Sequence, residues 1–479
     1  MSRLLREAYD IENFRQSGHG LLNKLAAYLG EAFEELDTKP IQWKNPEESL
    51  VFWRDFLENG DTECFFDEVL KRSTHLHHPG YLGHQVSPAA PVTLLTSSIS
   101  AALNNGTAVY EMGMVTNPME RIITEWLGRK IGYTENHSGF LTSGGTLANL
   151  TALLSARKAQ VTADVWNEGH QKPLGIMVSE EAHYCIERAA KIMGLGEQGL
   201  LKIPVKSDFS MDTSALEDCY QKAQQSGIEV FAIVGSAPST ATGIFDDLDA
   251  IGVFAQKYKL WYHVDAAHGG AALFSPKYRG TLIGIAKSDS VVIDGHKMMM
   301  MPGITTALVY KDARTSNVTF SQKADYLLED SQESDWYNSG KRTFECTKNM
   351  MALHWFVLLK MYGEGIFDEF VTTLFDLGHL FAEMIQKETA LELAIPPKTN
   401  IVCFRYHNVD LETDTLNQIN VQIRQQLLED GEFYIVQTKI RGVQYLRVTI
   451  MNPFTTQKHL KRLLAKVNLL SETLLKEKN

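Results

Sequence analysis

Residues 291–303 read VVIDGHKMMMMPG, so a single lysine, Lys297, lies between a run of aliphatic residues and four methionines. The β-branched residues before the Asp-Gly-His turn predict a buried strand. Lysine is rarely buried without a partner, so this amine needs an explanation. An apolar setting disfavours the ammonium form and predicts a lowered pKa, which makes the amine a better nucleophile toward a carbonyl. The alternative is a lysine whose amine simply reaches solvent from an apolar stem.

Short apolar runs of the same kind recur from about residue 75 to residue 370, with helical patterns between them: GIMVS, EVFAIVGS, KLWYHVDAA, SVVIDGH and TTALVY. This alternation predicts an α/β domain with a mostly parallel sheet covered by helices. Helical patterns fill the first seventy residues, and a mixed pattern follows a helical stretch near 348–388. We therefore predict an N-terminal helical segment (1–74), a large α/β domain (75–374) and a small C-terminal α+β domain (375–479).

Composition and charge restrict the class of protein. The chain has 479 residues, of which 44% are hydrophobic and 22% charged, as in an ordinary globular protein. Its formal charge of -12 argues against binding to nucleic acid or to an anionic membrane surface. It contains no run of eighteen apolar residues, and its first residues, MSRLLREAYDIENF, do not resemble a secretory signal. Five scattered cysteines without CxxC spacing fit a reducing compartment, so we expect a soluble, cytoplasmic protein.

The sequence Ser-Gly-Gly-Thr at 143–146 opens a predicted helix. Two glycines at a helix N-terminus expose backbone N–H groups and the positive end of the helix dipole to an anion such as a phosphate. The alternative is a capped helix that packs closely on its neighbour. The stretch is neither a Walker loop nor a GxGxxG fingerprint, which argues against a nucleoside triphosphate or a dinucleotide.

Two further polar side chains follow apolar strands. Asp265 ends the run WYHVD and is either a turn aspartate or a functional charge, and His183 follows GIMVS and is either structural or placed to stack on a flat ligand. A phosphate site, a stacking histidine, an aspartate and a desolvated lysine at strand ends are together what pyridoxal 5′-phosphate requires. The lysine forms the Schiff base, and the aspartate keeps the pyridinium nitrogen protonated.

From about His75 to Pro453 the chain resembles the pyridoxal-phosphate-dependent group II amino-acid decarboxylases. The segments that carry the resemblance follow in order: HPGYLGHQ, TSGGTLANLTALLSAR, EEAHYCIERAA, HVDAAHGG, DGHK and LRVTIMNPFTT. The resemblance implies the type I fold of pyridoxal-phosphate enzymes, with a mostly parallel seven-stranded sheet flanked by helices. It also implies decarboxylation of an L-amino acid to the corresponding amine and carbon dioxide.

The resemblance assigns roles by position in this chain. It implies that Lys297 holds pyridoxal 5′-phosphate covalently as an aldimine, that Asp265 pairs with the pyridine nitrogen, and that His183 stacks on the ring and relays a proton. A mobile loop of the family carries a tyrosine that protonates the substrate carbon, and here Tyr326 is our first choice and Tyr337 the second. Further cofactor contacts are implied for Gly145, Thr146, Thr240, Ala267 and His296.

Two positions depart from the family pattern. Asp294 stands where the aromatic enzymes often have asparagine, which leaves that polar contact open. Pro238 replaces a glycine that usually begins the turn before Thr240, so we expect a local difference in the backbone.

The resemblance further implies a homodimer with its active site at the subunit interface, and His84, Gln85 and Tyr110, with the neighbouring Glu111, are candidates to line the substrate cleft. The histidines at 75, 77 and 78 lack partners at metal-site spacing, so no metal is expected.

An aldehyde synthase or another carbon–carbon lyase is the alternative within this fold, and Tyr326 argues against the synthase. A non-catalytic homologue is the alternative of another class, and the intact Lys297, Asp265 and His183 argue against it. The sequence does not identify the amino acid.

Overall fold

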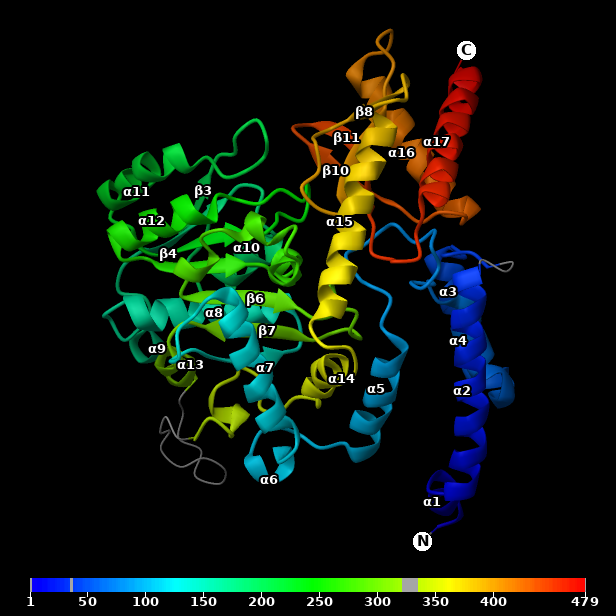
Figure 1. The fold of residues 1–479 in the computed structure, drawn as a ribbon, viewed down its shortest axis with the longest axis horizontal. Coiled ribbons are helices and arrows are strands. Elements are labelled where there is room, and N and C mark those ends of the chain that lie inside the picture. Colours follow the sequence, from blue (N-terminus) through cyan, green and yellow to red (C-terminus); the bar gives the residue numbers. More distant parts are fainter. Residues whose placement is uncertain (1, 35–37, 321–334, 479) are drawn as a thin grey trace. The chain divides into compact units, whose positions relative to one another are not determined.

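The computed structural model describes residues 2–34, 38–320 and 335–478 and divides the chain into two compact units (Figure 1). Unit 1 comprises residues 1–84, 383–394 and 403–479, and unit 2 comprises residues 85–382 and 395–402. The predicted three-part division at residues 74 and 374 stays a prediction. Within the described ranges, no helix combines the length and the apolarity that a membrane span requires.

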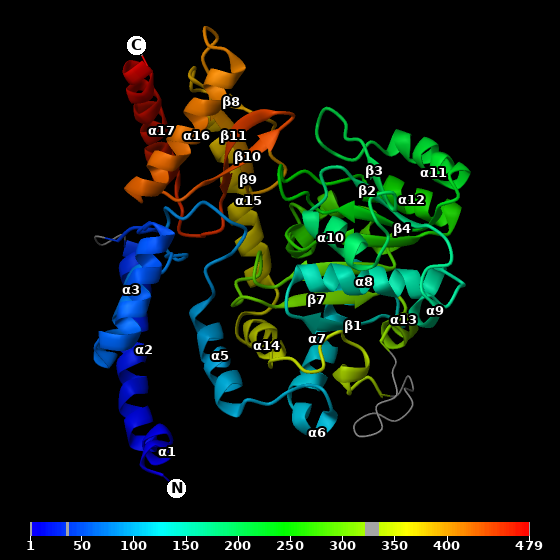
Figure 2. The same ribbon diagram turned by 180° about the vertical axis from the view of Figure 1, so that it is seen from behind.

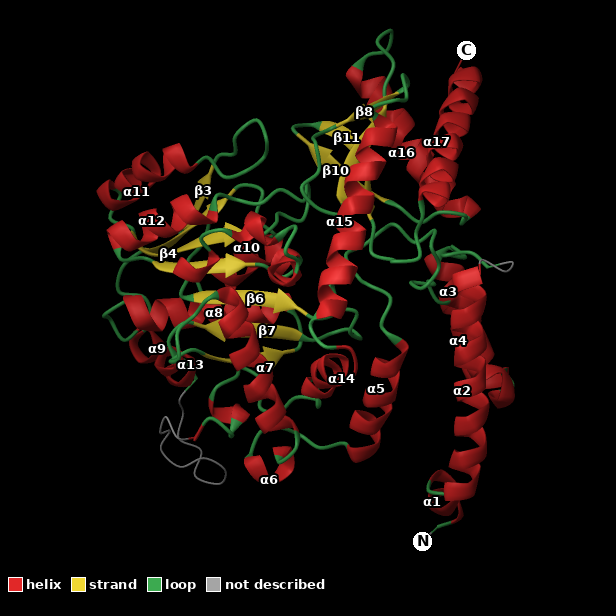
Figure 3. Ribbon diagram, viewed as in Figure 1, coloured by secondary structure: helices red, strands yellow, loops and turns green. Residues whose placement is uncertain are grey.

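Unit 2 is built on a seven-stranded sheet, which confirms the predicted α/β fold (Figure 3). The strand order is β1-β7-β6-β5-β4-β2-β3, and every neighbouring pair is parallel except those of β7, which runs antiparallel to β1 and β6. Six of the strands are buried along their length or nearly so, as the β-branched runs predict. The strands are β1 (Ser138–Thr142), β2 (Leu174–Ser179), β3 (Leu200–Ile203), β4 (Glu229–Ser236), β5 (Trp261–Asp265), β6 (Ser290–Asp294) and β7 (Thr306–Tyr310).

Helices flank this sheet, as the view from behind also shows (Figure 2). The helix that opens at the Gly-Gly sequence, α8, packs across β1 and across β4 to β7 through small and branched residues such as Ala148 and Leu153. The helices of unit 2 are α5 (Pro91–Leu103), α6 (Tyr110–Gly113), α7 (Thr116–Ile131), α8 (Gly145–Gln160), α9 (Val165–Glu168), α10 (Tyr184–Ile192), α11 (Leu216–Gln225), α12 (Leu248–Tyr258), α13 (Ala313–Val318), α14 (Ala352–Tyr362) and most of α15 (Gly365–Ile385).

Unit 1 combines the N-terminal helices with a four-stranded sheet of order β10-β11-β9-β8. Its β10 and β11 form an antiparallel hairpin, and Tyr434 forms a parallel bridge with Tyr81. The elements are α1 (Arg3–Ala8), α2 (Ile11–Glu34), α3 (Pro46–Asn59), α4 (Phe65–Arg72), β8 (Leu391–Leu393), β9 (Ile401–Tyr406), α16 (Thr413–Asp430), β10 (Val436–Ile440), β11 (Val443–Thr449) and α17 (Gln457–Lys478).

Candidate active site

The carboxyl ends of the parallel strands of unit 2 bring several predicted residues to one edge of the sheet. Asp265 ends β5 and lies in register with Ser236 of β4 and Val292 of β6. Asp294 ends β6, and Lys297 follows it within one turn. Ligands of parallel α/β sheets bind at this edge, so its side chains are the natural candidates for the chemistry.

The amine of Lys297 forms an ion pair with Asp294, with 3.0 Å between Nζ and Oδ2. Burial by itself lowers the pKa of Lys297, but the carboxylates of Asp294 and Asp265 outweigh burial and raise it above its ordinary value. The predicted lowering of this pKa is therefore wrong, because the setting contains two carboxylates and is not simply apolar. The Lys297 side chain as a whole is 20% exposed, so the residue is not sealed within the core.

Asp294 also lies at the start of α8. A methyl group placed on Gly145 would come within 3.1 Å of both Asp294 carboxylate oxygens, which shows how closely the carboxylate approaches the helix N-terminus. Thr306 donates its hydroxyl to Oδ1 of Asp294 at 2.5 Å, and Nε2 of His296 lies 3.7 Å from Oδ2. The sequence left open which polar contact position 294 makes. In the structure its carboxylate contacts Lys297, Thr306 and His296.

The helix N-terminus has the features of an anion site. Gly144 caps α8 with a φ of +117°, a conformation that favours glycine. Gly145 and Thr146 are the first two helical residues, whose backbone N–H groups have no acceptor within the helix. His296 is buried beside Asp294. These donors and the helix dipole suit a phosphate, while Asp294 is an anionic group that such a phosphate would meet.

His183 caps α10, and its Nδ1 accepts the backbone N–H of Cys185 at 3.3 Å. Burial lowers the pKa of His183; Asp265 opposes this effect and Lys297 adds to it. These three predicted residues are therefore within electrostatic range of one another. A neutral imidazole at this point offers a flat face to a planar ligand.

Asp265 accepts hydrogen bonds on both oxygens. The backbone N–H of Ala267 donates to Oδ1 at 3.2 Å, and Nδ2 of Asn149 donates to Oδ2 at 3.0 Å. Asn149 was not among the predicted site residues, although it lies four residues after Gly145 and therefore on the same side of α8. The four-residue spacing from Gly145 is the sequence signal that could have identified Asn149.

The other predicted cofactor residues lie on loops of the same unit. Thr240 is half-buried in the turn that follows β4, where the hydroxyls of Ser239 and Thr242 lie 2.7 Å apart and the Ala237–Pro238 peptide is cis. Ala267 is buried, whereas the side chain of Thr146 is exposed. Tyr326 lies outside the described residues.

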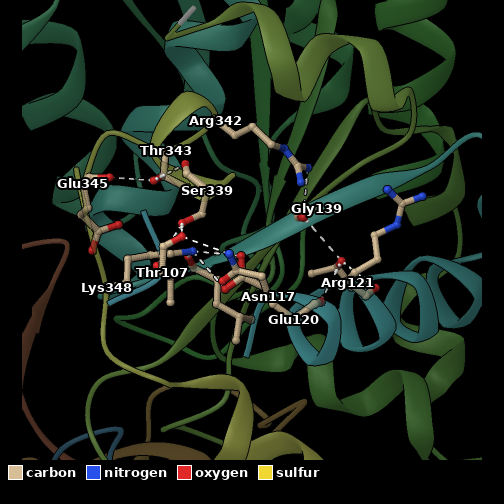
Figure 4. Close-up of polar contacts among 12 residues, drawn as sticks. Thr107, Asn117, Glu120, Arg121, Gly139, Ser339, Arg342, Thr343, Glu345 and Lys348 are labelled. Atoms are coloured by element: carbon tan, nitrogen blue, oxygen red, sulfur yellow. Dashed lines mark hydrogen bonds and ion pairs between the residues drawn. The ribbon is translucent and has the colours of Figure 1, made fainter. Parts of the chain in front are cut away.

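A buried polar network holds the segment 339–348 against α7 and β1 (Figure 4). Nζ of Lys348 pairs with Glu120 at 2.9 Å and donates to the carbonyl of Leu141 at 2.7 Å. Arg342 donates to the hydroxyl of Ser138 at 2.8 Å and to the carbonyl of Gly139 at 3.2 Å. The network fixes the strand that leads into the Gly-Gly sequence.

The same segment brings Glu345 to Ser143, whose backbone N–H it accepts at 3.2 Å and whose hydroxyl it also contacts. The donors of Ser143 are therefore already engaged. The N–H groups that remain for an anion at the helix start are those of Gly145 and Thr146.

Two of the predicted substrate residues belong to unit 2. The Tyr110 ring packs edge-on against Tyr337, with 5.5 Å between the ring centroids. Gln85 is buried, and its Nε2 has no hydrogen-bond partner among the described residues. Tyr337, the second choice for the loop tyrosine, is thus placed beside a candidate residue for the substrate cleft.

His84, the third predicted substrate residue, belongs to unit 1. Its Nε2 lies 3.0 Å from the hydroxyl of Tyr434, and burial together with Arg447 and Arg424 lowers its pKa. Arg447 is only 7% exposed, and its Nε and Nη2 have no hydrogen-bond partner among the described residues. A buried guanidinium with unused donors can bind a carboxylate. Sequence reasoning missed Arg447, although the quoted LRVTIMNPFTT contains it.

The residues of unit 2 fit pyridoxal phosphate on their own chemistry. They supply a lysine amine at the edge of the sheet, a carboxylate that already accepts two hydrogen bonds, a flat histidine and a glycine-led helix N-terminus. Within the described ranges, no group of three or more His, Cys, Asp or Glu side chains is placed to hold a metal ion.

Comparisons with known proteins agree with this chemistry. The pyridoxal-dependent decarboxylase conserved domain matches residues 67–407. The L-2,4-diaminobutyrate decarboxylase of Acinetobacter baumannii is 29% identical over 83% of this chain and 81% of its own length. The aspartate 1-decarboxylase of Aliivibrio fischeri is 28% identical over 84% and 81%, respectively. The crystal structure of mouse CSAD shares the fold, with a TM-score of 0.86 at 24% identity over 95% of this chain and 99% of that chain.

Proposed function

Because the chain belongs to the pyridoxal-dependent decarboxylase family and is a pyridoxal-phosphate-dependent amino-acid decarboxylase, we propose that Lys297 is the residue that holds the cofactor covalently. The proposed reaction converts an L-amino acid to the corresponding amine and carbon dioxide. The observation that carries the assignment of Lys297 is the place of its amine at the edge of the sheet, paired with Asp294 and within electrostatic range of Asp265 and His183. When bound, the cofactor supplies a protonated aromatic ring that accepts the electron pair of the broken carbon–carbon bond.

The residues of unit 2 then have distinct tasks. Asp265 would accept a hydrogen bond from the protonated ring nitrogen, and the backbone N–H of Ala267 and the side chain of Asn149 fix the position of its carboxylate. His183 would stack on the ring, and Ala267 would lie against it. Gly145 and Thr146 would bind the phosphate with backbone N–H groups at the start of α8, and Thr240 and His296 would complete the binding site.

Proton return to the substrate carbon is the last chemical task of the protein. We assign it to the hydroxyl of Tyr326 on sequence grounds, with His183 as the group that can relay a proton from water. Excluding bulk water during this step protects the reactive carbon from side reactions.

The test of the proposed function is a comparison of wild-type protein with Lys297→Ala. Wild-type protein purified with pyridoxal phosphate should show the visible absorption of a cofactor attached to lysine, and this band should disappear in Lys297→Ala. Carbon dioxide release should fall by at least several thousandfold because the covalent attachment is lost. A wild-type protein without the band would contradict the assignment, and hydrogen peroxide with ammonia among the products would favour the aldehyde synthase.

The substrate is found with the same readout. The relatives act on amino acids of different charge, so a panel of the twenty amino acids with cysteine sulfinate, diaminobutyrate and ornithine should be assayed for trapped carbon dioxide. We propose that His84, Gln85 and Tyr110 line the substrate cleft, and each should change KM more than kcat when replaced by a residue without hydrogen-bonding groups.

We also propose that the protein is a homodimer that completes the active site at its interface. The helices α1 and α2 of unit 1 support this, because α2 buries only Ala32 while apolar side chains such as Leu4, Ile11, Phe14 and Leu22 are exposed. Exposed apolar surface of this kind marks interaction sites. Sedimentation equilibrium should give about twice the 53.8 kDa of one chain, and a monomer would contradict the proposal.

A further inference from the structure

Behind Asp265 lies a row of buried polar groups that the family assignment does not explain. Nδ2 of Asn149 is 3.0 Å from Asp265, and Oδ1 of Asn149 is 2.7 Å from Nε2 of His263. Nδ1 of His263 lies 2.8 Å from the hydroxyl of Ser290, which receives Nε1–H of Trp261 at 2.9 Å. None of the four residues behind Asp265 is more than 3% exposed: Asn149, His263, Ser290 and Trp261.

The fold explains why these residues meet. Trp261, His263 and Asp265 alternate along β5 and therefore point to the same face of the sheet. Ser290 lies in register with His263 on the neighbouring strand β6. Helix α8 packs on β5 and β6 and carries Asn149.

The direction of every hydrogen bond in this row follows from its two ends. The Trp261 indole only donates, so Ser290 accepts from it. At the other end the Asp265 carboxylate only accepts, so Asn149 gives it the NH₂ group, its carbonyl accepts from Nε2 of His263, and Nδ1 of the neutral imidazole accepts the Ser290 hydroxyl.

The electrostatics agree with this direction. Burial lowers the pKa of His263 to about 4, against the opposing effects of Asp265 and of a backbone hydrogen bond with Ser290, so the imidazole is neutral at pH 7 and carries one ring hydrogen. Hydrogen bonds donated to a carboxylate hold it in one orientation. Asp265 receives one from Asn149 and one from the backbone of Ala267.

We propose that Asn149 is a positioning residue, oriented by His263, Ser290 and Trp261, that holds the Asp265 carboxylate in the orientation in which it accepts a hydrogen bond from the protonated ring nitrogen of the cofactor. This inference rests on the proposed function, because it requires Asp265 to face that nitrogen. The rate of decarboxylation would then depend on Asn149, a residue that touches neither the substrate nor the cofactor.

The test is ¹⁵N NMR of the holoenzyme loaded with pyridoxal phosphate labelled at the ring nitrogen. Asn149→Leu removes the donor with little change in side-chain volume, so the Asp265 carboxylate should lose this orientation, its hydrogen bond to the ring nitrogen should weaken, and the ¹⁵N resonance should shift toward that of an unprotonated pyridine. His263→Leu should shift it in the same direction by a smaller amount. We expect kcat of Asn149→Leu to fall by roughly tenfold or more, with KM changed much less.

Asn420→Leu is the matched control, because Asn420 is equally buried in unit 1 and bonds Tyr406 and Leu416. It should lose thermal stability without moving the ¹⁵N resonance. An unshifted resonance in Asn149→Leu overturns the inference, and if that variant does not fold, an unshifted resonance in His263→Leu overturns it equally. A wild-type protein without bound cofactor would instead contradict the proposed function, so the two failures are distinguishable.

Discussion

Lys297 and Asp294 are three residues apart, and their ion pair determines how the amine behaves before the cofactor arrives. A Schiff base forms from the neutral amine, whereas the carboxylates of Asp294 and Asp265 raise the pKa of Lys297 against the effect of burial. At neutral pH most of the amine is therefore an ammonium ion. Cofactor loading should accelerate as the pH rises toward this pKa.

Asp294→Asn removes the nearer carboxylate and should lower the pKa of Lys297. The loading rate of cofactor-depleted protein should then reach its maximum at a correspondingly lower pH. Stopped-flow absorbance of the bound cofactor, measured across the pH range, reports this shift.

Thr306→Val is the matched control, because it removes the hydroxyl that bonds Asp294 but leaves the carboxylate charge. Its pH profile of loading should lie close to that of wild-type protein. Identical profiles for wild-type protein and Asp294→Asn would mean that the ion pair does not limit loading.

Part of the candidate site can be predicted from sequence because its residues follow apolar strands directly. Asp265 and Lys297 were found in this way, and both lie at the predicted edge. The direction of the Lys297 pKa was not predictable, because it depends on how close two carboxylates come in space. Asn149 was missed for a related reason, since its contact with Asp265 joins residues 116 positions apart.

At the scale of elements, the buried strands β2, β4, β5, β6 and β7 follow from their β-branched runs. β1 and β3 were not recognised among the apolar runs, because β1 contains Gly139 and has a polar residue at each end, and β3 is a four-residue strand only partly buried. The antiparallel direction of β7 and its place between β1 and β6 are not encoded in any local pattern. Strand order depends on packing between distant segments.

The contact between β1, α7 and the segment 339–348 includes a buried ion pair, in which Lys348 and Glu120 are 6% and 8% exposed. Lys348→Met leaves the Glu120 carboxylate buried without its cation and should lower the free energy of unfolding by about 3 to 5 kcal/mol. Urea unfolding followed by circular dichroism measures this difference.

The double variant Lys348→Met with Glu120→Leu should recover most of the lost stability, because it leaves no unpaired charge. A single variant that costs less than about 1 kcal/mol would show that the pair is solvated. Lys191→Met, which breaks an exposed pair with Glu187, provides the comparison and should have little effect.

At the scale of the whole molecule, the two units interleave along the chain, with α15 and β9 each divided between them. Composition does not change at these points, so a sequence pattern cannot locate them. It was predictable that the resemblance extends over most of the chain, because the segments that carry it lie in both units.

The whole molecule should also be sensitive to acid because it buries neutral histidines. Burial lowers the pKa of His75, His263 and His354 to about 4. Between pH 6.5 and pH 4 the unfolded chain binds more protons at these histidines than the folded one, so their contribution to stability is complete above pH 6.5 and is lost as the pH falls through 4. Each contributes on the order of 3 kcal/mol at most, at about 1.4 kcal/mol per pKa unit.

His354→Gln should therefore flatten the decline of the melting temperature between pH 6.5 and pH 4. His354 is 9% exposed and shares a hydrogen bond with Thr96, so the overall stability of the variant is reduced at pH 7 as well. His19→Gln alters an exposed histidine and should leave the slope unchanged. Parallel slopes for wild-type protein and His354→Gln would rule out this histidine as a source of acid sensitivity. Differential scanning calorimetry gives the melting temperatures.

The four methionines after Lys297 have one more consequence. Their exposed fractions are 1%, 0%, 8% and 1%, so the fold shields them from a dissolved oxidant. Sulfoxide at residues 298–301 would therefore form mainly in molecules that have opened next to Lys297. Peptide mass spectrometry after a brief peroxide pulse would measure the sulfoxide at these four methionines and thereby report how often this stretch opens.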